Sequence, residues 1–299
     1  MQPALLSPDA PLSRDMRDFL SSYPSQLRSP PSVAPNYAFY TRPPAASDGV
    51  IAMQKELRGD WDKLEWRHDF VQWLFPIREQ GMNPRARPLQ VHEIGRMKDD
   101  EEVMKRFRES YEIMLAFYGL RLVDPETGEL DVTVAPEKSD GGWPARFYNL
   151  EHSMHNYLRI TRILKSLHEL AHAHYIPSFL LAILALQHPA PDDAHPAARL
   201  KTGGLVRSMD GYWRHCIRDA GTREWVRATL ERVRREGAWG LGAYRAAVLG
   251  YKQTGIWGQP PGEEQAVEQA PDGEGQTANE VDAEAPKVAE EPPVHVTAS

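Results

Sequence analysis

The stretch DDEEVMKRFRESYEIMLAFY, residues 99–118, carries the clearest helical pattern in the chain and decides the fold class. Asp99 stands before the first turn and Glu102 follows three residues later, which is the spacing of a capping box. Gly119 is suited to the position that ends a helix. The pattern predicts a long helix whose apolar residues share one buried face: Val103, Met104, Phe107, Tyr111, Met114, Leu115 and Tyr118.

The rest of the central chain repeats this periodicity. It predicts further helices at 48–58, 61–74, 147–174, 205–219, 222–235 and 238–257. Residues 178–187 are apolar on nearly all sides, which predicts a central, buried helix. Strand signals are nearly absent. Residues 124–142 are predicted to form a long loop, with one short candidate strand at 130–134. We therefore expect an all-α fold with a single multi-helix globular domain.

The two ends differ from this pattern. Residues 1–35 are rich in Pro and Ser, which predicts a disordered segment. The aromatic run 36–40 suggests a short arm that docks on the domain 36–257. Residues 258–299 hold ten acidic residues, one basic residue and no aromatic residue, which predicts an acidic, disordered tail. The tail accounts for the net charge of −7, so the rest is nearly neutral and lacks the basic field typical of nucleic-acid binding.

Several features of the sequence bear on the cellular compartment of the protein. Cys216 is the single cysteine, so no disulfide can form within the chain and a reducing environment is expected. Met1–Pro11 lacks the basic and apolar regions of a signal peptide. The longest apolar run, 176–186, is shorter than the roughly 20 residues that span a bilayer. We expect no transmembrane segment and a cytoplasmic or nuclear location, or both.

A zinc motif occurs at 168–172, where the sequence reads H-E-L-A-H. On a helix, His168 and His172 could bind one zinc ion while Glu169 acts as a general base, so a zinc-dependent hydrolase is one alternative function. No third ligand follows, because Tyr175 and Ser178 occupy the positions that need a glycine and a histidine. The competing interpretation is two surface histidines on a helix, and we expect no metal and no cofactor.

Five arginines lie between Arg223 and Arg235, interleaved with Glu224 and Glu231. Such a helix could contact phosphates, which makes a nucleic-acid adaptor a second alternative. The same spacing is typical of a solvated helix face held by ion pairs between residues four apart. Because the chain lacks a basic field, the solvated face is the favoured interpretation.

A polar strip interrupts the apolar face of the helix predicted at 147–174. Arg159 and Arg162 lie three residues apart on it, and paired arginines on a rigid helix suit carboxylates. These carboxylates could belong to a ligand or to the chain's own acidic residues, and the sequence leaves both open. For the ligand alternative, the predicted binding residues are Trp73, Phe75, Arg78, Asn156, Arg159, Arg162 and Lys165.

Three strings of this chain resemble the conserved N-terminal domain of the opioid growth factor receptor family. They are HDFVQWLFPIRE at 68–79, RESYEIMLAFYGLRL at 108–122 and HNYLRITRILKSL at 155–167. Their order and spacing match as well, and the resemblance covers roughly 36–235. The imperfect C-terminal repeats of animal members are replaced here by the acidic tail.

The resemblance implies an all-α, non-enzymatic binding protein with opioid growth factor receptor activity and without a seven-helix membrane bundle. It implies a peptide or protein partner, with the enkephalin-like peptide methionine-enkephalin as the ligand of the named animal member. It also implies growth-regulatory signalling in the cytoplasm and nucleus. For this family, a membrane location would be only a label derived from the receptor name, or a peripheral association.

Overall fold

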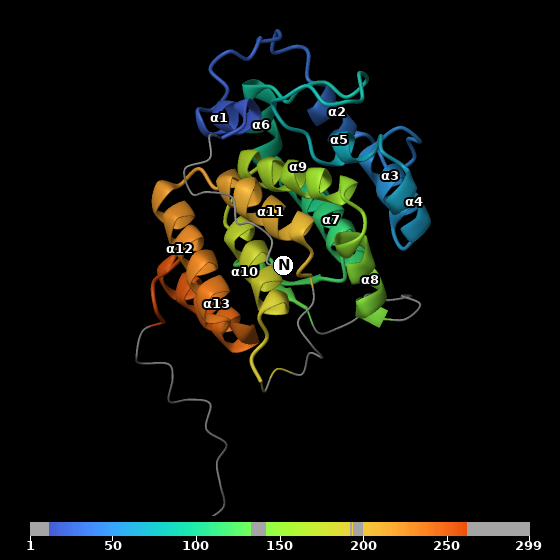
Figure 1. Cartoon of the computed structure of the whole chain (residues 1–299). Helices are drawn as coiled ribbons and strands as arrows, with labels where there is room; N and C mark the ends of the chain where they lie inside the picture. The colour runs from blue at the N-terminus through green and yellow to red at the C-terminus, as the bar shows by residue number, and fades with distance from the viewer. Residues whose placement is uncertain (1–11, 133–141, 192, 194–199, 262–299) are drawn as a thin grey trace, which may run out of the picture. The chain divides into compact units, whose positions relative to one another are not determined.

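The structure is a computed structural model that describes residues 12–132, 142–191, 193 and 200–261 (Figure 1). Its α-helices are α1 Arg14–Leu20, α2 Pro35–Thr41, α3 Val50–Leu57, α4 Trp61–Trp66, α5 Val71–Leu74, α6 Val91–Lys98, α7 Glu101–Phe117, α8 Gly142–Glu151, α9 His155–Glu169, α10 Tyr175–Gln187, α11 Gly203–Gly211, α12 Ala220–Glu236 and α13 Gly240–Thr254. The remaining elements are the strands β1 Arg121–Asp124 and β2 Glu129–Asp131 and the 3-10 helix η1 Trp213–Cys216. The predicted all-α fold is confirmed.

The long helix predicted from residues 99–118 is α7. Asp99 ends the preceding helix α6, and Asp100 caps α7 instead, because its side chain accepts a hydrogen bond from the amide of Val103 at 3.1 Å. Gly119 follows with a φ of 79°, a conformation that favours glycine. All but one of the predicted face residues are buried, and the exception, Met104, is partly buried against the core.

We expect the substitution Asp100→Ala to lower the free energy of unfolding by about 1 kcal/mol, because it removes the cap of α7. The matched substitution Asp99→Ala should have a smaller effect, since the Asp99 side chain does not cap this helix. Urea unfolding followed by far-UV circular dichroism measures both. A larger loss of stability for Asp99→Ala than for Asp100→Ala would show that Asp99 caps the helix, as the sequence pattern predicts.

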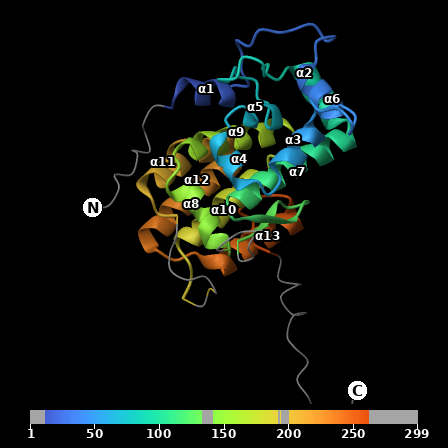
Figure 2. The same cartoon turned by 90° about the vertical axis from the view of Figure 1, so that its right-hand side faces the viewer.

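The centre of the core is α10, and each of its thirteen residues is buried, as its apolar composition predicts. It packs against α13, β2, η1, α12 and α9. Both views place it among the C-terminal helices, while α1, α2, α5 and α6 gather at one end of the described residues (Figure 1, Figure 2). The loop predicted after α7 begins instead as an antiparallel hairpin of β1 and β2, where the Tyr244 hydroxyl accepts a hydrogen bond from the Leu130 amide at 2.6 Å.

The N-terminal region is more ordered than its composition predicts. Helix α1 buries Met16 and Phe19 completely and packs against η1. Arg218 donates a hydrogen bond to the Phe19 carbonyl at 2.8 Å. The prediction of disorder over 1–35 is therefore wrong for residues 12–35, because segments that are distant in the sequence pack around these side chains. Residues 1–11 and most of the predicted tail, 262–299, lie outside the described residues.

The aromatic arm predicted at 36–40 lies in α2, which buries Phe39 and Tyr40. The Tyr40 hydroxyl donates a hydrogen bond to the Leu74 carbonyl at 2.6 Å. This contact fixes α2 to the end of α5. The single helix predicted at 61–74 is in fact two short helices, α4 and α5, with an irregular turn between them.

Candidate functional site

Arg159 of α9 holds the turn that separates α4 from α5. Its side chain is buried, and the residue is only 5% exposed. Its guanidinium donates hydrogen bonds of 3.1 Å or less to five acceptors: the carbonyls of Leu64, Glu65 and Arg67, Oδ1 of Asn156 and Nδ1 of His68. The chain's own backbone thus uses its donors, although Arg159 also lines the groove described below, so its contact with a partner stays a prediction. The carboxylate partners considered from the sequence are replaced by backbone carbonyls.

Asn156 and Lys165 are also buried on α9. The Asn156 amide donates to Glu65 at 3.2 Å and to the Asn149 carbonyl at 2.9 Å. The Lys165 ammonium lies 3.0 Å from Asp15 and 2.7 Å from Glu79. Both side chains thus have partners within the chain, and their binding to a partner molecule stays a prediction.

The three predicted binding residues that precede α6 differ in their surroundings. Phe75 is fully buried beside Phe107, with ring centroids 5.9 Å apart, so it cannot touch a partner. Arg78 donates to Gln26 at 2.7 Å and to the Ser22 carbonyl at 3.0 Å, which ties this segment to the turn after α1. Trp73 remains partly exposed and lines a groove.

Arg162 makes fewer hydrogen bonds within the chain than Arg159 does. Its Nε donates to the Phe75 carbonyl at 2.8 Å, and one terminal nitrogen lies 3.5 Å from the Gln72 carbonyl. Among the described residues no carboxylate forms an ion pair with it. Burial lowers the pKa of Arg162 to about 10, so the guanidinium stays charged at neutral pH. The result is a largely buried cation that forms no ion pair of its own within the described ranges, and the nearby charge of Glu79 favours its protonated form only in part.

Arg162 opens into a groove between α9 and residues 68–82, here called the α9 groove, with a volume of about 510 Å³. Val71 and Ile77 give it a buried apolar floor. Two exposed apolar side chains lie at its rim: Leu158 is 75% exposed and Met82 is 94% exposed. The groove therefore offers an apolar surface beside two arginines, Arg159 and Arg162, that form no ion pair among the described residues.

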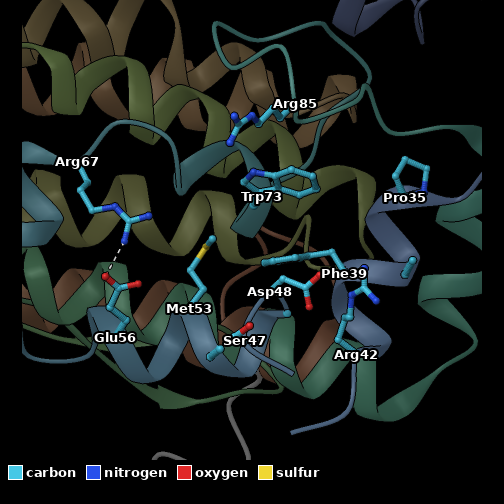
Figure 3. A pocket seen from close by; sticks show the side chains of 13 residues that line it. Pro35, Phe39, Arg42, Ser47, Asp48, Met53, Glu56, Arg67, Trp73 and Arg85 are labelled. Atoms are coloured by element: carbon cyan, nitrogen blue, oxygen red, sulfur yellow. Dashed lines mark ion pairs between the residues drawn. The ribbon is translucent and has the colours of Figure 1, made fainter. Parts of the chain in front are cut away.

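A second groove lies on the other side of α5, and we call it the Trp73 groove. Its volume is about 480 Å³, and α2, α3 and the turn between them form much of its wall. Figure 3 shows Trp73 and Phe39 over its centre, with Met53 pointing into the same space. The structure thus divides the predicted binding set, because Trp73 lines one groove and Arg162 lines the other.

The sequence analysis did not identify the residues that give the two grooves their character. Leu158 was not among the predicted binding residues, and its exposure is a property of the folded chain. Met82 and Arg85 gave no signal, and Phe39 was predicted only as part of the aromatic arm 36–40, because the grouping of the residues in each groove depends on contacts between segments that are distant in the sequence.

The zinc motif does not form the geometry that it needs. Helix α9 ends at Glu169, and Ala171 has a φ of 60°, so His168 and His172 do not share a helix face. The interpretation as surface histidines is also wrong: the His168 ring packs on Phe19, and His172 is buried. Glu169 pairs with Arg218. Within the part of the chain that the structure describes, no three His, Cys, Asp or Glu side chains could hold a metal together.

The arginine-rich helix is α12, and its charges are satisfied internally. Arg227 pairs with Glu224 and Glu231, the latter four residues away, as predicted for a solvated face. Each of the other four arginines also binds within the chain: Arg223 to the carbonyls of Ile217 and Arg218, Arg232 and Arg235 to Glu236, and Arg234 to Asp210. This pairing gives the nucleic-acid alternative no support. Across the described ranges, no helix is long and apolar enough to cross a bilayer.

Comparison with known proteins gives the ancestry of this chain. The family model described as the opioid growth factor receptor conserved region matches residues 31–246. Opioid growth factor receptor-like protein 1 of Mus musculus is 37% identical over 188 residues, which cover 60% of this chain and 39% of that protein. The Xenopus tropicalis protein of the same name is 40% identical over 178 residues, 58% of this chain and 33% of the relative.

Opioid growth factor receptor of Homo sapiens is 38% identical over 167 residues, which cover 54% of this chain and 24% of the receptor. The matched part thus spans between about a quarter and two fifths of these relatives. No solved structure matches the chain. The family match covers more than half of the residues and includes every lining residue of the two grooves except Asp15. On these findings the chain belongs to the opioid growth factor receptor family and carries that family's conserved region.

Proposed function

We propose that this chain is a non-enzymatic binding protein that takes a peptide or protein partner in the α9 groove. The observation that carries the proposal is Arg162, a desolvated guanidinium without a carboxylate partner among the described residues. A cation removed from water without a counter-charge is unfavourable, and an anion that reaches it restores the balance. We infer that the partner supplies a carboxylate.

The neighbouring acids balance the charge of Arg162 only in part. Glu79 and Asp15 also line the α9 groove, but both are held by Lys165. The exposed Leu158 and Met82 beside Arg162 favour a partner that places apolar side chains next to its carboxylate. A peptide that ends in an apolar residue with a free C-terminus has this chemistry.

The names of the relatives suggest a probe. Several are called opioid growth factor receptor, and the family's enkephalin-like ligand, Tyr-Gly-Gly-Phe-Met, ends in methionine and a free carboxylate. We propose that this chain binds such a peptide and acts in growth-regulatory signalling in the cytoplasm or nucleus. The relatives are named as receptors, which agrees with a role outside catalysis.

We expect labelled Tyr-Gly-Gly-Phe-Met to bind the full chain saturably, and the substitution Arg162→Gln to weaken binding by about tenfold or more. The peptide with an amidated C-terminus should bind the unmodified chain with a similar loss, because it cannot pair with the guanidinium. Fluorescence anisotropy, with competition by unlabelled peptide, measures these affinities.

Two controls separate binding from folding. Leu158→Glu changes an exposed residue at the groove rim, so it should weaken binding without altering the thermal melt. Arg85→Gln changes an exposed cation in the other groove and should leave this binding unchanged. Equal affinity for the free and amidated peptides, or a folded Arg162→Gln variant that binds normally, would refute the role of Arg162.

A further inference from the structure

The Trp73 groove has an apolar slot that lies outside the proposed site. The indole of Trp73 packs beside the ring of Phe39, with centroids 5.3 Å apart. Met53, from α3, points toward them from the opposite wall (Figure 3). Two aromatic rings and a flexible thioether accept a large apolar side chain and adapt to its shape.

The slot also carries a free hydrogen-bond donor. Trp73 is partly buried, and its Nε1–H, which donates to no acceptor among the described residues, stays accessible to water. A half-buried indole N–H usually finds a partner. In a groove this size, a backbone carbonyl of a bound peptide can supply one.

The charged side chains around the slot are not all paired. Two of its three arginines are paired: Arg42 lies 3.0 Å from Asp48, and Arg67 lies 2.9 Å from Glu56. Arg85 is exposed and, within the described ranges, forms no ion pair, while its backbone amide is held by Asn83 at 3.0 Å. In the view of Figure 3 its guanidinium lies toward the edge of Trp73 that carries the nitrogen. The groove therefore has one uncompensated positive charge beside an apolar slot.

We propose that the Trp73 groove is a second binding site, for an extended segment of a partner protein in which a large apolar residue is followed by Asp or Glu. The apolar side chain fills the slot between Trp73 and Met53. A backbone carbonyl of the segment accepts the Trp73 N–H, and the carboxylate pairs with Arg85. This site goes beyond the proposed function, because α5 separates it from the α9 groove.

The same charges argue against other occupants. Asp48 and Glu56 line the groove beside the paired arginines, so a polyanion such as RNA would meet two carboxylates. Electrostatic contacts supply most of the non-specific affinity for nucleic acid, and one free arginine supplies little of it. An uncharged apolar ligand would leave Arg85 unused. A peptide with one apolar and one acidic residue matches both features.

The test uses two fluorescein-labelled peptides and the full chain. One peptide is Gly-Ser-Gly-Phe-Asp-Gly-Ser-Gly with both ends blocked, and its matched control has Asn in place of Asp. We expect Arg85→Glu to weaken the Phe-Asp peptide about tenfold, while the Phe-Asn peptide changes less than about twofold. Trp73→Phe should weaken both peptides, because it removes the indole donor and keeps an aromatic ring.

Folding and site assignment are checked on the same variants. Arg85 is exposed, so Arg85→Glu should retain the far-UV spectrum and the thermal melt. The Trp73 indole ¹⁵N–H signal, identified by its loss in Trp73→Phe, should shift on addition of the Phe-Asp peptide. Arg162→Gln should leave this affinity unchanged, so the test of the second site is independent of the test of the proposed function.

Three outcomes would overturn the proposal: no binding of the Phe-Asp peptide at millimolar concentration, equal affinity for the Phe-Asp and Phe-Asn peptides, or binding that Arg85→Glu does not alter. If Arg162→Gln abolishes binding and Arg85→Glu does not, the peptide occupies the α9 groove and the second site is refuted.

Discussion

Replacing Arg159 by methionine is expected to lower the free energy of unfolding by about 3–5 kcal/mol, because several buried carbonyls lose their hydrogen-bond donor. The Arg159 guanidinium donates to the carbonyls of Leu64, Glu65 and Arg67, and methionine offers these oxygens no donor. Each buried polar group left without a partner costs about 1–3 kcal/mol. Urea unfolding followed by far-UV circular dichroism gives the change.

The matched control is Arg162→Met, three residues further along α9. Arg162 has two backbone acceptors, and its side chain faces the α9 groove, so water can replace it more easily. We expect a smaller loss of stability there and a larger loss of peptide binding. If Arg159→Met is as stable as the unmodified chain yet binds no peptide, Arg159 is a partner contact and the structural role is refuted.

Acidification is expected to destabilise the fold between pH 6.5 and about 4. Burial lowers the pKa of His168 to about 4 and that of His172 to about 4 in the folded state. In the unfolded state both titrate near 6.5, so below that pH the unfolded chain binds more protons than the folded chain. Stability therefore falls as the pH falls through this window, by up to about 1.4 kcal/mol per pH unit for each histidine.

The measurement is the urea midpoint at pH 7.5, 6.5, 5.5 and 4.5. The variant His168→Gln cannot take up this proton, so its midpoint should depend less on pH between 6.5 and 4.5. Its absolute stability is a separate matter, because the His168 ring packs against Phe19 at a centroid distance of 5.5 Å. A midpoint that stays constant from pH 7.5 to 4.5 in the unmodified chain would contradict the prediction.

The helices that pack on the core were predictable because their signal is local. α7 shows its buried face within seventeen residues, and α10 shows full burial by composition alone. α1 was missed for the opposite reason. Its two buried residues are too few for a periodic signal, and its surroundings come from α9 and η1, more than a hundred residues later.

The candidate site was predicted in part. The polar strip of α9 predicted carboxylate recognition, and Arg162 on that strip lines a groove and forms no ion pair among the described residues. The sequence could not separate Arg162 from Arg159, because the difference depends on the turn after α4, more than ninety residues earlier. It also could not show that Trp73 and Arg162 face different grooves.

The position of α5 has a geometric consequence for any protein that uses both grooves. Neighbouring residues of this four-residue helix face different sides, since Gln72 lines the α9 groove and Trp73 lines the other. An α-helix is about 10–12 Å across, which about four extended residues can span. Two short motifs on one chain could therefore be held at once. A tether of that length gives a local concentration in the millimolar range, so two weak contacts could act as one durable attachment.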